Sequence, residues 1–270
     1  MFDKLPNDII TEIQKHLSYL DYVNLKPVCK KTSQLKMEFR PIILNKLAKH
    51  VPNPEELLEK IKEFGAIITG SFILASINQN DSYNDIDIYE NTTLDHATLS
   101  QYLFNQKEDF FRLTRRPLYD WKYRFELYKE SYMVRDFMVK GTNLQHIRID
   151  CDIIKYINNA FDLDICKNYF DGEKLHIRSV KKITEKYDYI KPNALLLNFY
   201  IQDKLEAKLE ARLVKYTERG YTITRHPDYH TIIQHISDLK QGKNGLQTMF
   251  EYGYGLIRDN HVNLDEYYLE

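Results

Sequence analysis

Ile67-Ile68-Thr69-Gly70-Ser71 is the run of sequence that decides how most of this chain folds, together with Asp85-Ile86-Asp87-Ile88 further along. The first run is apolar and β-branched and ends at a glycine, which predicts a buried strand followed by a tight turn. A short apolar helix is expected next, at residues 72–77, and a second strand at residues 85–89. Alternation along that second strand places its two aspartates on one face and its isoleucines on the opposite, buried face.

The end of the first strand suits the binding of phosphate. Gly70 has no Cβ, so backbone N–H groups can approach phosphate oxygens, and Ser71 adds a hydroxyl donor at a helix start, where the dipole favours an anion. Asp85 and Asp87 beside such a turn can hold divalent cations, which would activate an attacking hydroxyl and stabilise a leaving pyrophosphate. Glycine and serine also follow ordinary strands, and paired aspartates also occur solvated on edge strands. The residues alone leave both interpretations open.

This order of an apolar strand, Gly-Ser, a helix and Asp-x-Asp resembles the polymerase β-type nucleotidyltransferase superfamily. The likeness is close over residues 65–90 and extends over residues 65–220 in the order of strands and helices. It implies a mixed-sheet α/β domain in which Gly70 and Ser71 bind the nucleotide, while Asp85 and Asp87 are catalytic and hold Mg²⁺. Such folds also persist as non-catalytic scaffolds, so the resemblance leaves enzymatic activity open.

The superfamily uses a third catalytic carboxylate on a neighbouring strand. Asp150 fits that place, because it ends a strand expected at residues 144–149. Asp162 and Asp164, in a strand expected at residues 161–169, are the alternatives. This later stretch also resembles uncharacterised nucleotidyltransferase-like proteins of large DNA viruses, which implies a viral protein.

The start of the chain predicts three short helices. Pro6 can open the first, because the first helical residue needs no N–H partner, and apolar residues then recur at helical spacing. Asp21 is expected to cap the second helix, and Pro27 to end it. Three short helices cannot bury all of these apolar side chains among themselves, so the remaining apolar surface is expected to pack against another part of the protein or a partner.

The runs Leu-Pro-x-Asp-Ile, Asp-x-x-Asn-Leu and Val-Cys-Lys, all within residues 1–45, resemble the F-box, a helical module that docks on Skp1-type adaptors of cullin ubiquitin ligases. Thr32 stands where that family usually carries a tryptophan, which weakens part of the apolar contact. The resemblance implies a Skp1-type adaptor and a cullin ligase as partners. It implies these adaptor-binding residues: Leu5, Pro6, Ile9, Leu17, Leu25 and Val28. The alternative is an amphipathic hairpin that packs on the rest of the protein.

Composition narrows the function classes. The chain has 270 residues, 43% of them hydrophobic, and a net charge of −1, so no global basic field attracts nucleic acid or a membrane. Its three cysteines are isolated, which suits a reducing compartment. No run reaches the length of a membrane span, and the N-terminus lacks the apolar core of a signal peptide. We therefore expect an intracellular protein, cytoplasmic or nuclear, with no membrane partner.

Together these patterns predict an α+β protein, with an F-box-like three-helix module at residues 1–50 and a nucleotidyltransferase-like α/β domain with C-terminal helices at residues 51–270. The expected function is that of an F-box substrate-recruiting subunit of an SCF-type ubiquitin ligase. Its second domain would then be a scaffold that binds an unknown target protein or a nucleoside triphosphate. The alternative is a Mg²⁺-dependent nucleotidyltransferase acting on a nucleic acid, a protein or a small molecule. A third possibility is an interaction module whose helices only pad the core.

Overall fold

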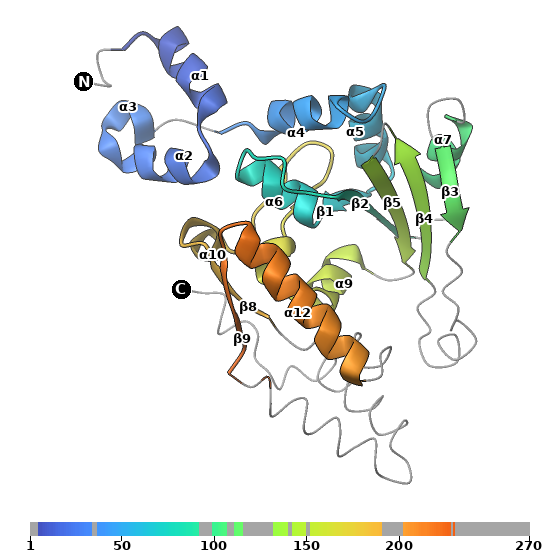
Figure 1. Ribbon diagram of the computed structural model, residues 1–270. Helices are drawn as coiled ribbons and strands as arrows, with labels where there is room; N and C mark the ends of the chain where they lie inside the picture. The colour runs from blue at the N-terminus through green and yellow to red at the C-terminus, as the bar shows by residue number, and fades with distance from the viewer. Residues whose placement is uncertain are drawn as a thin grey trace. The chain divides into compact units, whose positions relative to one another are not determined.

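A computed structural model of the chain (Figure 1) describes residues 5–33, 37–91, 99–106, 111–115, 132–139, 142–149, 152–190, 202–227 and 229. These residues fall into two compact units. Of the described residues, the first unit contains those between 5 and 149 together with 168–177, and the second contains 152–167, 178–190, 202–227 and 229. Among the described residues, no helix is long and apolar enough to cross a membrane.

The N-terminal segment is helical, as its sequence predicts. It contains α1 (Asn7–His16), α2 (Tyr19–Leu25), the 3-10 helix η2 (Lys26–Val28) and α3 (Lys30–Ser33). The prediction that Asp21 caps the second helix is wrong by three residues, because Ser18 is the N-cap. The Ser18 hydroxyl accepts the N–H of Asp21 over 3.2 Å, and the Asp21 carboxylate accepts the N–H of Ser18 over 3.0 Å. This is a capping box, in which two backbone donors are satisfied reciprocally.

The first unit is built on a mixed seven-stranded sheet with the order β3-β4-β5-β2-β1-β6-β7 (Figure 1). Strands β2 and β5 run parallel, and the other neighbouring pairs run antiparallel. The mixed α+β architecture is confirmed, whereas the nucleotidyltransferase-like fold stays a prediction. The strands are β1 (Ile67–Thr69), β2 (Asp85–Asn91), β3 (Phe111–Arg115), β4 (Tyr132–Val139), β5 (Thr142–Ile149), β6 (Tyr169–Phe170) and β7 (Leu175–His176). The helices are α4 (Phe39–Ala48), α5 (Pro54–Glu63), α6 (Ser71–Ile77) and α7 (Leu99–Asn105).

The core of this unit lies where the sequence predicts it. Every residue of β1 and of α6 is buried. On β2, Ile86 and Ile88 are 1% and 0% exposed, while Asp85 and Asp87 on the other face are half-buried. Burying each isoleucine contributes roughly 1.5–3 kcal/mol, which fixes the face that β2 turns inward. The predicted strand alternation is therefore confirmed.

The second unit contains a two-stranded parallel sheet and several helices. The strand expected at residues 161–169 is wrong, because the chain makes a 3-10 turn there. In that turn the N–H groups of Cys166 and Lys167 donate to the carbonyls of Leu163 and Asp164 over 3.1 Å and 3.0 Å. The elements of the unit are α9 (Ile153–Ala160), η3 (Asp164–Cys166), α10 (Val180–Thr184), β8 (Tyr187–Ile190), α12 (Gln202–Glu218) and β9 (Thr222–Arg225).

Buried charges link the elements of the second unit. Lys182 of α10 donates to Asp164 of η3 and to Asp188 of β8, the latter over 2.8 Å. Asp188 also accepts the N–H of Ile165 over 2.9 Å. Burial acts to lower the pKa of Lys182, but the charges of the two carboxylates outweigh burial and raise it. Asp164 and Asp188 are 4% and 1% exposed, so the Lys182 ammonium compensates charges that water does not reach.

Two further contacts join η3 and the residues before it to α12. Arg212 donates to Asp162, and the Cys166 thiol donates to the Tyr216 hydroxyl over 2.9 Å. Burial raises the pKa of Cys166 to about 12, so the thiol stays protonated at neutral pH. Asp162 and Cys166 are therefore held by hydrogen bonds to α12, and the chain around them does not form a strand.

Replacing Lys182 with methionine should lower the free energy of unfolding by roughly 3–5 kcal/mol, because the buried Asp188 loses its ion-pair partner, while Asp164 keeps Lys167 at 2.7 Å. Chemical denaturation followed by circular dichroism measures this loss. Lys181→Met, at the exposed neighbouring position of the same helix, is the control and should change stability by about 0.5 kcal/mol or less. Equal losses in the two variants would contradict a stabilising role for the Lys182 contacts.

Candidate functional site

The four residues predicted to form a nucleotide site come together at the end of β1. Gly70 is the N-cap of α6, and Ser71 is its first residue. Strands β1 and β2 are antiparallel, with Thr69 opposite Asp87, so the Gly-Ser turn lies beside the start of β2. The antiparallel pairing thus brings both short runs of the sequence to one end of the sheet.

The two aspartates face this turn. A Cβ on Gly70 would lie 2.7 Å from Oδ2 of Asp87, closer than a carbon and an oxygen tolerate, and the φ of Gly70 is +75°. The Ser71 hydroxyl donates to Oδ1 of Asp85 over 3.4 Å. Glycine is favoured at residue 70, because its positive φ strains other residues and a Cβ there would displace the Asp87 carboxylate.

This arrangement offers part of what a magnesium site needs. Mg²⁺ is commonly bound by one or two carboxylates together with water and phosphate oxygens, so Asp85 and Asp87 fit as ligands. Within the described ranges, no group of three or more His, Cys, Asp or Glu side chains is placed to hold a metal.

The strand beside the aspartates carries amides. Asn143 and Gln145 of β5 are the register partners of Asp85 and Asp87, and both are half-buried. On the next strand, Asp136 of β4 is the register partner of Gln145. The sequence does not predict that Asn143, Gln145 and Asp136 lie in register with the two aspartates, because the register between distant strands has no local signal.

The third carboxylate stays a prediction. Asp150 lies outside the described residues, and the strand before it ends at Ile149, the register partner of Asn91 at the far end of β2 from Asp85. Asp162 and Asp164 belong to the second unit, where each accepts a hydrogen bond from a basic side chain. Those two carboxylates already contribute to buried ion pairs.

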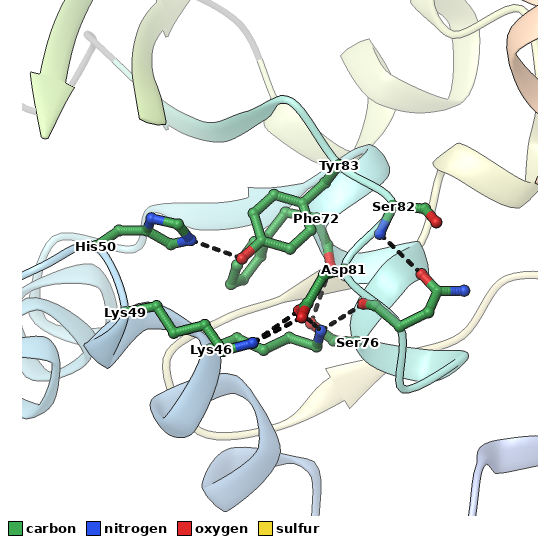
Figure 2. Close-up of polar contacts among 9 residues, drawn as sticks. Lys46, Lys49, His50, Phe72, Ser76, Asp81, Ser82 and Tyr83 are labelled. Carbon is green, nitrogen blue, oxygen red and sulfur yellow. Dashed lines mark hydrogen bonds and ion pairs between the residues drawn. The ribbon is translucent and has the colours of Figure 1, made fainter. Parts of the chain in front are cut away.

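Ion pairs anchor the loop between α6 and β2 (Figure 2). Lys49 donates to the two carboxylate oxygens of Asp81 over 2.9 Å and 2.8 Å, and Lys46 donates to Oδ1 over 3.0 Å. Lys46 also donates to the carbonyl of Asn80. The hydrogen bonds from Lys49 and Lys46 lower the pKa of Asp81 to about 2. Helix α4 thus holds the loop that leads into the two aspartates.

A second set of contacts fixes the loop just before Asp85. Figure 2 shows the His50 ring in contact with the Tyr83 hydroxyl, at a Nε2–O distance of 2.7 Å. Nδ1 of His50 lies 2.8 Å from the hydroxyl of Thr142 on β5. The Tyr83 ring meets Phe72 of α6 edge-to-face, with 5.0 Å between centroids. Two residues before the first aspartate, the chain is therefore bound to α6, to β5 and to the segment after α4.

The N-terminal helices leave apolar side chains in solvent. Ile9 is 44% exposed and Val28 58% exposed. Leu5, Leu17 and Leu25 are half-buried, and Pro6 is exposed. Among the described side chains of residues 5–33, only Ile10 and Thr32 are buried. The six predicted adaptor-binding residues therefore all retain accessible surface.

Thr32 has a local role that the sequence did not reveal. Its side chain is 0% exposed and accepts the N–H of Cys29 over 3.0 Å while donating to the Cys29 carbonyl over 2.9 Å. The threonine thus satisfies the backbone at the start of α3.

Residues 37–195 match the family described as Gabija anti-defense 2 family protein. The chain therefore belongs to the Gabija anti-defense 2 family. Residues 2–40 match the F-box domain, which confirms the resemblance predicted from the sequence. The search of curated proteins gave no match. The Gabija anti-defense 2 match contains Gly70, Ser71, Asp85 and Asp87, and the F-box match contains all six predicted adaptor-binding residues.

In this Gabija anti-defense 2 family member, the Asp81 ion pairs predict a stability that depends on pH. A carboxyl whose pKa is lower in the folded state stabilises the fold above its unfolded pKa, and this contribution is lost as the pH falls towards the folded pKa of about 2. Because Asp81 is exposed, solvent screening limits the effect, and Asp81→Asn should lose about 1 kcal/mol or less at pH 6. Denaturation between pH 6 and pH 2 should show this difference vanish, whereas Glu185→Gln, at an exposed position, should follow the wild type. A difference that persists at pH 2 would contradict the ion pairs as its source.

Proposed function

We propose that this chain is a substrate-recruiting subunit of an SCF-type ubiquitin ligase. The F-box segment docks on a Skp1-type adaptor, which links it to a cullin. The segment matched by the Gabija anti-defense 2 family then binds the protein to be ubiquitinated. The observation that carries the proposal is the exposure of Ile9 and Val28 within the segment that matches the F-box domain.

The physical argument rests on apolar surface. Helices of the length of α1, α2 and α3 are marginal in water and depend on tertiary contacts for their stability. Covering a side chain such as Ile9 or Val28 with a partner contributes up to roughly 1.5–3 kcal/mol. An adaptor groove that covers these positions would supply the contacts that the N-terminal segment lacks by itself.

The family name suggests the class of target. It refers to action against the Gabija defence, and we propose that the matched segment recognises a protein of a host defence system. Recruitment by the F-box segment would then lead to the removal of that defence protein. Neither the F-box segment nor the recognition segment performs bond chemistry in this scheme.

Changing Ile9 and Val28 to aspartate should weaken binding of the purified chain to a Skp1-type adaptor by at least about 30-fold, since each change puts a charge into an apolar contact. Isothermal titration calorimetry measures the affinity. Both side chains are exposed, so the double variant should keep the circular dichroism spectrum of the wild type.

The matched control is Val214→Asp, because Val214 is 55% exposed on α12 of the second unit. It should bind the adaptor like the wild type. Undiminished binding by the double variant, or an equal loss with Val214→Asp, would remove the F-box docking assignment.

A second candidate function is metal-dependent nucleotide binding, favoured by the contact of Gly70 with Asp87. Bound Mg²⁺ would join the carboxylates of Asp85 and Asp87 to a triphosphate. Gly70 and Ser71 would donate to its phosphate oxygens from the start of α6. If a third carboxylate completes the site, the reaction would be transfer of a nucleotidyl group to a nucleic acid, a protein or a small molecule.

The double variant Asp85→Asn/Asp87→Asn should bind nucleoside triphosphates in the presence of Mg²⁺ at least about tenfold more weakly, because neutral amides do not attract the cation. Titrations with ATP, GTP, CTP and UTP, each with Mg²⁺ and with EDTA, measure this without any turnover. Glu185→Gln is the control, since Glu185 is exposed in the second unit and should leave triphosphate binding unchanged. Wild-type chain that binds no triphosphate, or binds equally well in EDTA, would refute this candidate.

A further inference from the structure

The parallel strands β8 and β9 present an outer face that neither proposed function uses. Tyr187 and Tyr189 alternate with Asp188 and Ile190 along β8, and only the latter two are buried. The register pairs Tyr187 with Thr222 and Tyr189 with Thr224. Neighbouring residues in register share a face of the sheet. We define the outer face as Tyr187, Tyr189, Thr222, Thr224 and the adjoining His226.

The aromatic rings of this outer face form a connected row. Tyr187 and Tyr189 have centroids 6.0 Å apart, and Tyr189 and His226 have centroids 6.1 Å apart. Both pairs meet edge-to-face. Tyr189, at the centre of the row, is 37% exposed, both threonines are exposed, and Tyr187 and His226 are half-buried. Aromatic and hydroxyl-bearing side chains are therefore accessible on the same face.

The segments around the outer face are basic, although the whole chain has a net charge of −1. The ammonium of Lys182 lies 5.8 Å from the centroid of the Tyr189 ring. Lys182 pairs with Asp164 and Asp188, and Arg225 pairs with Glu210. Apart from these pairs, residues 178–190 and 215–226 contain five lysines and arginines against two carboxylates. This local excess of positive charge complements an anionic ligand.

We propose that the outer face binds single-stranded nucleic acid. Stacking on tyrosine and histidine rings suits unpaired bases, hydroxyl groups suit sugars and base edges, and surrounding lysines and arginines suit phosphates. An acidic peptide would use the charge but has no need for a row of rings. A duplex would keep its bases stacked inside and leave the rings without a partner.

The test is fluorescence anisotropy with the full chain and a labelled oligothymidine of about 12 nucleotides, at salt concentrations of about 50 and 200 mM. Wild-type chain should bind, and more weakly at the higher salt concentration. Tyr189→Leu keeps an apolar side chain but removes the ring, and should bind at least about tenfold more weakly. Tyr189→Phe keeps the ring and should stay within about twofold of wild type. Circular dichroism spectra and thermal unfolding of the same variants report whether the chain is folded.

Three results would overturn the proposal. The first is a wild-type chain that does not bind the oligothymidine at about 50 mM salt. The second is Tyr189→Leu binding as tightly as Tyr189→Phe. The third is equal displacement of the oligothymidine by a matching duplex or by a poly-glutamate peptide, which would make the outer face a general anion-binding surface.

Discussion

The close approach of Gly70 to Asp87 constrains the whole first unit. A Cβ at residue 70 would lie 2.7 Å from Oδ2 of Asp87 on the neighbouring strand and would displace that carboxylate. The chain can therefore leave β1, turn at positive φ and begin α6 directly against β2. Helix α6 follows as a fully buried element, and the loop after it must return within a few residues to start β2. The place of the Asp87 carboxylate beside the turn thus depends on the missing side chain of Gly70.

Local patterns predicted the parts of the fold that local burial decides. The run before Gly70 and the alternation of Ile86 and Ile88 with two aspartates could be interpreted correctly, because each strand face has one environment. The same reasoning failed at residues 161–169. There the aspartates alternate with apolar residues, but Asp162 and Asp164 are buried with Arg212 and Lys182 instead of facing solvent. A period-two pattern does not distinguish solvated charges from charges paired across the fold.

Of the candidate site, the sequence predicts the Gly-Ser turn and the two aspartates but not the residues that surround them. Gly70, Ser71, Asp85 and Asp87 lie close in sequence, and a glycine between a strand and a helix is a local signal. The neighbours of the site come from further away: Lys46 and Lys49 reach Asp81 from α4, and Asn143 and Gln145 arrive by the register of β5. The sequence around residue 143 does not indicate that Asn143 and Gln145 lie beside Asp85 and Asp87. The third carboxylate could not be chosen for the same reason, since its choice requires the strand register.

The amides on β5 help to decide between the two proposed functions, recruitment to a ubiquitin ligase and nucleotidyl transfer. A carboxylate on that strand would add negative charge beside Asp85 and Asp87 and strengthen the hold on a second cation, whereas Asn143 and Gln145 add only neutral oxygens. Two aspartates would hold one hydrated cation together with a phosphate, whereas the two-ion chemistry of transfer would use a further carboxylate. The F-box segment has the opposite property, because its accessible apolar surface is stabilised only when a partner covers it. The F-box match and the accessible apolar surface of that segment therefore favour the proposed recruiting role over the proposed transfer reaction.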